Sequence, residues 1–405
     1  MNSLEKIKRE IRKKTGISVV SLVGLLIDCA NQLRASDIHF DPLVDGLRVR
    51  FRIDGLLQEK FFLPKSIHSQ LISRIKILAG LRTDEHNAAQ EGRFRKKIDG
   101  GKNLDVRVSI APTYYGENAV LRLLVNRLDD FTLETLGFNQ EHQNKIQEAL
   151  NKPYGMILAT GPTGCGKTTT LYALIQMLNK SDVSIITIEE PIEYAIEGIK
   201  QVQVNQKTGL TFANGLRSFL RQDPNIIMVG EIRDSETANL AVNAALTGHL
   251  LLSTLHTNDA VTTLVRLLDM KVEPFLVAST INIAIGQRLV RTICSVCKDS
   301  REMSKGEFEF LSRISPKNVD KHQVLYFGRG CQECNDSGYQ GRIGIYEILV
   351  MNSDLKEAIL KKETAEEIKK LAIEKGMSTM IEDGLAKAKA GLTTIDEVVR
   401  VIHEH

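Results

Sequence analysis

The sequence has little excess charge of either sign and no long apolar run. Its 405 residues carry 53 Lys and Arg against 50 Asp and Glu, a net charge of only +3. Bulk nucleic-acid binding usually needs a stronger basic excess. The longest apolar candidate, residues 17–27, stops at Asp28, short of the roughly 18 residues that suggest a membrane span, and residues 1–10 lack the apolar core of a secretory signal. We therefore expect a cytoplasmic protein without a transmembrane helix.

Cysteine is also scarce, but its placement is informative. Four of the six cysteines form two close pairs, within 294–297 and 331–334, while Cys29 and Cys165 stand alone. In an intracellular protein such pairs favour a metal site over disulfides.

What the chain does have is an ordinary globular composition, with 42% hydrophobic and 25% charged residues. Its length predicts two or three domains at about 150 residues each. Apolar residues recur at helical spacing over 18–33, with Ser18 as the N-cap, and again over 67–78. Alternation and apolar runs predict strands over 47–53, 92–98, 104–110 and 119–125, the first followed by a hairpin at Asp54-Gly55. These elements indicate a small α+β domain.

A second unit follows a helix predicted over 140–150. Buried strands are predicted over 155–160, 183–188, 226–229 and 250–254, with helical stretches between them. Apolar strands that alternate with helices predict a largely parallel α/β sheet.

The first of these strands leads directly into a phosphate-binding loop. The motif G-x-x-x-x-G-K-[ST] is complete, and its residues are Gly161, Pro162, Thr163, Gly164, Cys165, Gly166, Lys167 and Thr168, followed by Thr169. Glycines let the backbone curl so that N–H groups point at phosphate, and Lys167 supplies a charge for the β- and γ-phosphates. The Thr168 hydroxyl is the expected Mg²⁺ ligand. We interpret Cys165 as a small filler.

Two acidic strand ends follow the loop. The strand 226–229 runs into Glu231, and the strand 183–188 runs into the acidic segment 189–193. Carboxylates at the carboxyl ends of parallel strands lie where ligands bind in open α/β sheets. They predict a metal-proximal acid and an acid that polarises water.

Four boxes in this order resemble the secretion ATPases of the type II secretion and type IV pilus assembly class. They are the phosphate-binding loop 161–168, the acidic box 187–194, the Walker B segment 220–234 and the histidine box 247–258. Residues 34–39 and 48–55 resemble the amino-terminal subdomain of the family. The resemblance implies a RecA-like P-loop motor domain preceded by a small α+β (PAS-like) domain and followed by a zinc-stapled helical segment.

The resemblance also implies residue roles. Glu193 would be the general base that activates water, and Glu231 would support Mg²⁺. His249 and His256 would sense or position the γ-phosphate region. Arg107 and Arg122 match arginines that reach over the nucleotide in such motors, and arginine suits phosphate because its planar fork pairs with two oxygens.

The two cysteine pairs resemble the tetracysteine module of assembly-type members. Cys294, Cys297, Cys331 and Cys334 would form a closed, structural zinc site, since four thiolates leave no open position for catalysis. The residues between the pairs must loop out, and Gly330 and Gly338 allow tight turns.

These patterns predict a charged tail (1–17), an amino-terminal α+β domain (18–126), a linker (127–140), a P-loop ATPase domain (141–290), a zinc module (291–345) and carboxy-terminal helices (346–405) with breaks at Gly376 and Gly391. Because few residues precede Ser18, we do not expect the extra amino-terminal docking domain of longer family members.

The leading hypothesis is a cytoplasmic homo-hexameric ATPase that uses ATP, Mg²⁺ and Zn²⁺. It would power the assembly of pilin-like subunits in a type IV pilus, a competence pseudopilus or type II secretion, through an inner-membrane platform protein that provides an indirect membrane association. Arg217 and Arg221 are candidates for a subunit interface.

Two alternatives stay open at this point. A P-loop nucleic-acid motor with a zinc knuckle is disfavoured by the mixed charge around the cysteines, where Tyr326 and Phe327 are a poor stacking platform. A non-enzymatic scaffold with a relic P-loop is disfavoured by the intact Lys167, Thr168 and Glu193.

Overall fold

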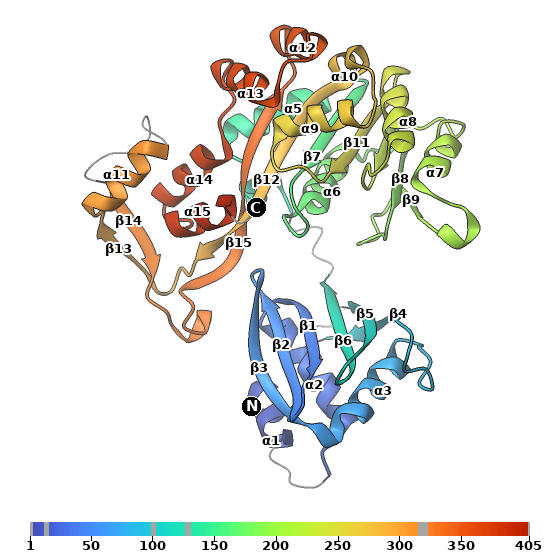
Figure 1. Cartoon of the computed structure of the whole chain (residues 1–405), viewed down its shortest axis with the longest axis vertical. Helices are drawn as coiled ribbons and strands as arrows, with labels where there is room; N and C mark the ends of the chain where they lie inside the picture. Colours follow the sequence, from blue (N-terminus) through green and yellow to red (C-terminus); the bar gives the residue numbers. More distant parts are fainter. Residues whose placement is uncertain (1–2, 12–15, 99–102, 126–130, 315–322, 404–405) are drawn as a thin grey trace. The chain divides into compact units, whose positions relative to one another are not determined.

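The computed structural model describes residues 3–11, 16–98, 103–125, 131–314 and 323–403. The chain divides into two compact units, Met1–Arg127 and Leu128–His405, each of which is described by itself (Figure 1).

The first unit is built on a six-stranded antiparallel sheet in the order β3-β2-β1-β6-β5-β4. Its strands are β1 (Ala35–Pro42), β2 (Gly46–Ile53), β3 (Leu56–Pro64), β4 (Gln90–Lys97), β5 (Asn103–Thr113) and β6 (Gly116–Val125). The predicted hairpin is confirmed, since Asp54 and Gly55 between β2 and β3 have φ values of 48° and 90°.

Helices pack on one face of this sheet. They are α1 (Ser3–Ile11), α2 (Val19–Gln32), the short helix η1 (Lys65–Ile67) and α3 (His68–Leu78). The helix predicted over 18–33 is confirmed, and the Ser18 hydroxyl caps it by accepting from the Ser21 N–H at 3.4 Å. Ile7 of α1 is fully buried in the same core, so α1 packs onto the unit.

The other face of the sheet carries a row of arginines in direct cross-strand register. Arg93 of β4 lies opposite Arg107 of β5, which lies opposite Arg122 of β6. The row continues to Asp37 of β1 and Arg52 of β2. Like charges directly opposite each other destabilise a sheet. Asp37 offsets part of this repulsion, because its carboxylate pairs with Arg122 at 3.1 Å and with Arg52 at 3.5 Å.

The second unit is built on a seven-stranded sheet in the order β15-β12-β7-β11-β10-β8-β9. Its strands are β7 (Gly155–Thr160), β8 (Ile185–Glu189), β9 (Lys200–Gln203), β10 (Ile226–Val229), β11 (Leu250–Leu255), β12 (Ile281–Ile293) and β15 (Tyr339–Val350). All neighbours are parallel except β15, which runs antiparallel to β12. The predicted parallel α/β sheet is confirmed, and the strands at 155–160 and 226–229 have the predicted bounds.

Helices cover both faces of this sheet (Figure 1). One face packs against α7 (Phe212–Phe219), α8 (Ser235–Leu246), α9 (Ala260–Asp269), α10 (Pro274–Thr280), α12 (Ser353–Leu360) and α13 (Ala365–Glu374). The other packs against α4 (Leu133–Leu136), α5 (Gln140–Leu150) and α6 (Lys167–Leu178). Alternate residues of β7 point to opposite faces, with Met156 and Leu158 in one core and Ile157 and Ala159 in the other.

Two long strands connect the parallel sheet to the carboxy-terminal part of the unit. β12 and β15 cross the predicted boundaries at 290/291 and 345/346, so one continuous sheet links the segments on either side. Beyond them lie β13 (Lys298–Glu302), α11 (Lys305–Ile314), β14 (Val324–Gly328) and the short helix η4 (Gln332–Cys334). The helices α14 (Met380–Lys389) and α15 (Ile395–His403) pack on β12 and β15 through Val290, Ile345 and Val398. The predicted breaks are confirmed, because Gly376 and Gly391 have φ values of 94° and 70°.

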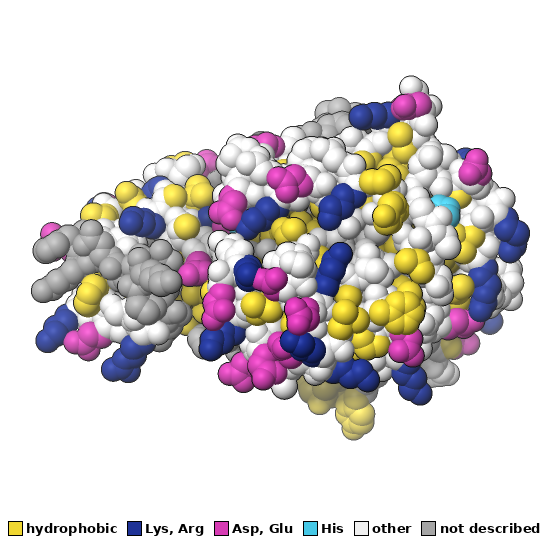
Figure 2. Space-filling model, turned by 90° about the horizontal axis from the view of Figure 1, so that it is seen from above, with side chains coloured by type: hydrophobic (Ala, Val, Ile, Leu, Met, Phe, Trp, Pro, Cys, Tyr) yellow, Lys and Arg dark blue, Asp and Glu magenta, His cyan; other side chains and the backbone are white. Residues whose placement is uncertain are grey.

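Across the described parts of the chain, none of the helices is both long and apolar enough to span a bilayer. The face shown in Figure 2 carries basic and acidic side chains side by side, as the near-neutral net charge predicts.

Candidate active site and cysteine cluster

The phosphate-binding loop lies between β7 and α6, at the carboxyl edge of the parallel sheet. Gly161, Gly164 and Gly166 all take positive φ values, of 147°, 80° and 90°, which side-chain-bearing residues rarely adopt. Gly166 is the N-cap residue of α6, so the exposed Thr168 lies in the first helical turn. A helix N-terminus with free N–H groups favours an anion.

Lys167 is buried against the loop that it serves. Its ammonium donates to the carbonyl oxygens of Gly161 at 2.8 Å and Pro162 at 3.0 Å. Burial lowers the pKa of Lys167, while the charge of Glu231 raises it. A desolvated ammonium next to the loop interacts strongly with phosphate, because little water has to be removed from it.

Glu231 and His256 lie at the same edge of the sheet, each just past the end of its strand. The Glu231 carboxylate accepts from Arg233 Nη2 at 2.6 Å and contacts His256 Nε2 at 3.0 Å. Burial favours the neutral acid, but these two partners outweigh it and hold the pKa of Glu231 below its usual range. Glu231 is therefore a carboxylate at neutral pH, as a metal-proximal acid requires.

The acidic box begins on β8 and continues beyond it, next to α6. Glu189 is buried, and its carboxylate accepts from the Tyr172 hydroxyl, from Thr187 Oγ1 at 2.6 Å and from Gln201 Nε2 at 3.2 Å. The Tyr172 hydroxyl in turn accepts from the backbone N–H of Glu193 at 3.2 Å. Glu189 is thus an anchor that holds the box, whereas Glu193 is half-buried.

His249 lies at the opposite edge of the sheet from the loop. It comes just before β11, and its carbonyl accepts from the N–H of Gly155 at the start of β7. Its Nδ1–H donates to the Ala244 carbonyl of α8 at 3.0 Å. Within one chain the structure brings His256, and not His249, together with the loop and Glu231.

The two predicted arginines belong to the first unit. Arg122 Nε donates to Asp37 Oδ1 at 3.1 Å, and Arg107 lies opposite Arg122 in the register of the sheet. In the second unit, Arg217 of α7 pairs with Glu236 of α8 at 2.5 Å, and Arg221 Nη1 donates to the Arg217 carbonyl.

The sequence reasoning missed two polar residues that line this site. Tyr172 and Gln287 are buried, and both hydrogen-bond to it: Gln287 Nε2 donates to the carbonyl of Cys165 at 2.7 Å. The detectable signal was the pair Gln287-Arg288, which interrupts the apolar run of 281–293. Cys165 itself is 4% exposed and fits its interpretation as a small filler.

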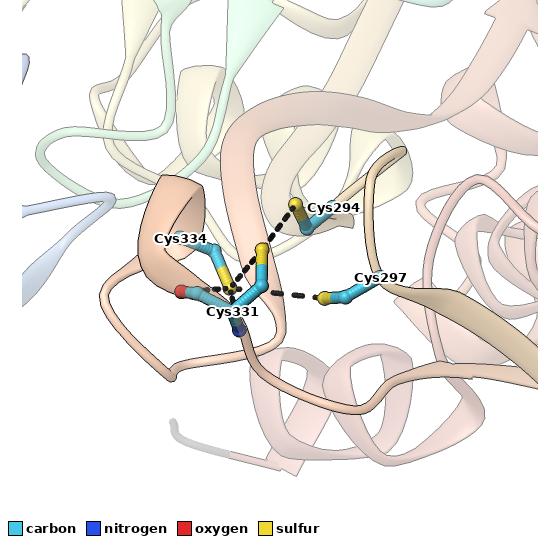
Figure 3. Close-up of side chains that lie close together, drawn as sticks. All are labelled: Cys294, Cys297, Cys331 and Cys334. Carbon is cyan, nitrogen blue, oxygen red and sulfur yellow. Dashed lines mark hydrogen bonds between the residues drawn. The ribbon is translucent and has the colours of Figure 1, made fainter.

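The four paired cysteines form one cluster (Figure 3). Cys294 follows β12 and Cys297 precedes β13, while Cys331 is the N-cap of η4 and Cys334 is its last residue. Their Sγ atoms all lie within 4.8 Å of one another. The pairs 294–331 and 297–334 are 3.8 Å apart, and 331–334 are 3.6 Å apart.

These distances fit a metal and exclude disulfides. A disulfide needs sulfurs about 2 Å apart, whereas tetrahedral thiolates at about 2.3 Å from a metal lie about 3.8 Å apart. The N–H groups of Cys331 and Gly338 donate to the Cys334 sulfur and, against its burial, lower the pKa of that thiol, whereas burial raises the pKa of Cys297. The donor set therefore suits a thiophilic metal ion in a closed site.

Comparisons with known proteins agree with this site. The family model described as "Type II/IV secretion system protein" matches residues 13–400. The type IV pilus assembly ATPase PilB of Myxococcus xanthus is 47% identical over 94% of this chain and 67% of that protein. The chain belongs to the type II/IV secretion system protein family. The type II secretion system protein E of Xanthomonas campestris is 48% identical over 95% of this chain and 68% of that protein.

A solved structure agrees with this assignment. The crystal structure of the pilus retraction motor PilT with bound ADP superposes with a TM-score of 0.62 at 27% identity, over 93% of this chain and 95% of that one. The predicted α/β fold class and the predicted ATPase of the type II secretion and type IV pilus assembly class are confirmed. The family implies ATP and Mg²⁺, and the nucleic-acid motor is not favoured.

Proposed function

We propose that this chain is the motor of a pilus-assembly or protein-secretion machine and that it hydrolyses ATP at the loop 161–168 as a homo-hexamer. The observation that carries the proposal is the meeting of the loop, Lys167, Glu231 and His256 at one edge of the sheet. Support for the cellular role comes from the relatives, which are named for type IV pilus assembly and type II secretion.

The chain's own groups divide the work of binding and hydrolysis. The loop N–H groups and Lys167 bind the β- and γ-phosphates, and Thr168 and Glu231 hold Mg²⁺. That ion, when bound, neutralises charge on the phosphate oxygens and orients them. Arg233 and His256 keep the Glu231 carboxylate ionised and fix its orientation.

Glu193 is the proposed general base. It takes a proton from a water molecule whose oxygen attacks the γ-phosphorus. The bond between the γ-phosphorus and the bridging oxygen breaks, which leaves ADP and inorganic phosphate. The buried anchor Glu189 and the Tyr172 hydroxyl support this role because they hold the backbone of the acidic box against α6.

The deciding experiment removes the charge at the loop. Lys167→Ala should lower ATPase turnover at least about 100-fold, because one preorganised charge on the transferring phosphoryl group contributes roughly that much. Turnover would be measured by phosphate release at saturating Mg²⁺–ATP. The matched control is Lys180→Ala, an exposed lysine just beyond the same helix. Equal turnover in the two variants would reject the proposed site.

We propose that the cysteine cluster holds zinc as a structural ion. Zinc prefers four thiolates in a tetrahedron, and the Sγ distances of 3.6–3.8 Å support that geometry. Metal analysis of the purified chain should find one zinc ion, and Cys297→Ser should lower that content. Cys29→Ser, which changes a buried cysteine of the first unit, should not. A wild-type protein without zinc would contradict the proposal.

A further part of the proposal concerns how the chain acts on a membrane-embedded machine. We propose that an inner-membrane platform protein receives the motion of the hexamer, so that the chain works at the inner face of the cell membrane. The pilus and secretion roles in the names of the relatives support this placement.

A further inference from the structure

One buried amide on β12 reaches the phosphate-binding loop from the side. Gln287 is 1% exposed, and its Nε2 donates to the carbonyl oxygen of Cys165 at 2.7 Å. Its Oε1 accepts from the Thr170 hydroxyl of α6 at 2.9 Å. Because a carbonyl oxygen can only accept, the nitrogen must face Cys165 and the orientation of the amide is fixed.

The bond to Cys165 determines where the next backbone N–H points. A trans peptide places its C=O and N–H on opposite sides. The carbonyl of Cys165 faces β12, so the N–H of Gly166 faces away from β12. Phosphate binding by such a loop depends on N–H groups that point at the anion, and a turned peptide would present a carbonyl oxygen to it instead.

Residue 287 also packs against both end glycines of the loop. A Cβ atom at Gly161 would lie 2.5 Å from the Gln287 carbonyl oxygen, and one at Gly166 would lie 3.3 Å from its Nε2. The Gln287 carbonyl in turn accepts from Arg288 Nη1 at 3.1 Å. Gln287 therefore covers the side of the loop that faces β12. Both its side-chain amide and its backbone carbonyl are held by hydrogen bonds.

We propose that Gln287 is a positioning residue, which holds the Cys165–Gly166 peptide in the orientation that binds nucleotide phosphate. The inference rests on the proposed ATP site and adds a residue to it. Gln287 acts through the backbone of the loop and not on the reacting atoms. Ground state and transition state share the phosphate contacts, so its loss should raise KM and leave kcat nearly unchanged.

The test replaces the amide by an apolar side chain of similar length. Gln287→Met should weaken ADP binding about tenfold by calorimetric titration and raise KM for ATP in proportion. Thr170→Val removes only the second hydrogen bond and should have a smaller effect. Circular dichroism melting of each variant would report the loss of stability separately.

A matched control lies on the same strand. Asn282 is 8% exposed, and its Nδ2 donates to the carbonyl of Tyr154 at 2.9 Å, just before β7 instead of just after it. Asn282→Leu removes an equivalent amide–carbonyl bond remote from the loop. It should lower the melting temperature about as much as Gln287→Met while ADP affinity stays unchanged.

The outcomes separate this inference from the proposed function. If Gln287→Met binds ADP as tightly as the wild type, or if both strand variants lose affinity equally, Gln287 does not position the loop. A wild type that neither binds ADP nor hydrolyses ATP overturns the proposed function as well. If Gln287→Met does not fold, Gln287→Asn, which withdraws the amide by one methylene, must show the same rise in KM or the inference fails.

Discussion

At the scale of single residues, the acids of the active site differ in their surroundings. Glu189 is buried under three donors and anchors the acidic box. Glu231 is ionised because Arg233 and His256 outweigh its burial. Glu193 is half-buried and is the proposed general base. The three carboxylates therefore have three different environments.

Glu193→Gln should separate binding from hydrolysis. The amide is nearly isosteric but cannot take a proton, so single-turnover hydrolysis should slow by about 10²–10⁴-fold while ADP affinity is retained. Rapid-quench measurement with excess enzyme checks the first expectation and calorimetry checks the second. The control is Glu148→Gln on the exposed side of α5. An unchanged single-turnover rate would remove Glu193 from the role of base.

Single residues also show which parts of the site a sequence pattern can predict and which it cannot. The loop 161–168 was predictable residue by residue, because its motif encodes a local backbone shape. Gln287 was not, since its partner Cys165 is remote in sequence and meets it only when β12 pairs beside β7. His249 shows the converse: the histidine box predicted one site for both histidines, and the strand between them carries them to opposite edges of the sheet.

At the scale of elements, the carboxy-terminal helices are attached through buried charges. Glu397 of α15 is 2% exposed and accepts from Arg291 of β12 at 2.5 Å and from Arg400 at 2.8 Å. Burial opposes ionisation, yet these arginines lower the pKa of Glu397 to about 2. The ionised acid therefore links α15 to the end of the strand that leads to Cys294.

Glu397→Gln should destabilise the protein in a pH-dependent way. Since the folded state holds the pKa below the unfolded value of 4.5, the contribution is complete above that pH and is lost as pH falls toward 2. At neutral pH the variant should lose about 2 kcal/mol, the usual scale of hydrogen bonds to a charged group. Denaturant melts at neutral and acidic pH check this.

The control for that experiment is Glu366→Gln, which changes an exposed acid of α13. It should differ little from the wild type at every pH. If the deficit of Glu397→Gln did not shrink on acidification, the ion pair would not be its source.

Helices and strands were predictable where apolar residues recur with a regular spacing or form one short run. The α2 helix and the strands β7 and β10 have a single strong apolar pattern, and their bounds were predictable. β12 and β15 were missed because long strands buried on both sides carry no alternation, and the cysteines nearby drew attention to a separate module.

At the scale of the whole molecule, the arginine row and the loop belong to different units. Arg93, Arg107 and Arg122 lie opposite one another in the register of the first unit's sheet, and Arg122 pairs with Asp37 at 3.1 Å. The contact of Arg107 and Arg122 with nucleotide stays a prediction, which substitution of Arg122 tests.

Arg122→Ala should lower kcat at least about 100-fold, since an arginine that stabilises the phosphoryl transition state contributes that much or more. ADP affinity should change little. Arg95→Ala is the control, because Arg95 is also exposed on the first unit's sheet and, like Arg122, pairs with an aspartate, Asp105 at 2.8 Å. Steady-state kinetics of both variants decide the matter, and matching kcat values would argue against a catalytic role for the row.

The strand β12 connects the phosphate-binding loop to the cysteine cluster, so the number of residues between the two sites matters. Gln287 contacts the phosphate-binding loop, and the same strand ends just before Cys294 of the cysteine cluster. Successive side chains of a strand point to opposite faces, and β12 already has one register shift, between Arg291 and Ile293. A further one-residue insertion would reverse the facing of the side chains beyond it. An insertion between 287 and 294 would either break the hydrogen bond from the Gln287 amide to the loop or point the thiol of Cys294 away from the other three cysteines. Relatives that keep both sites should therefore keep the length of the segment 288–293.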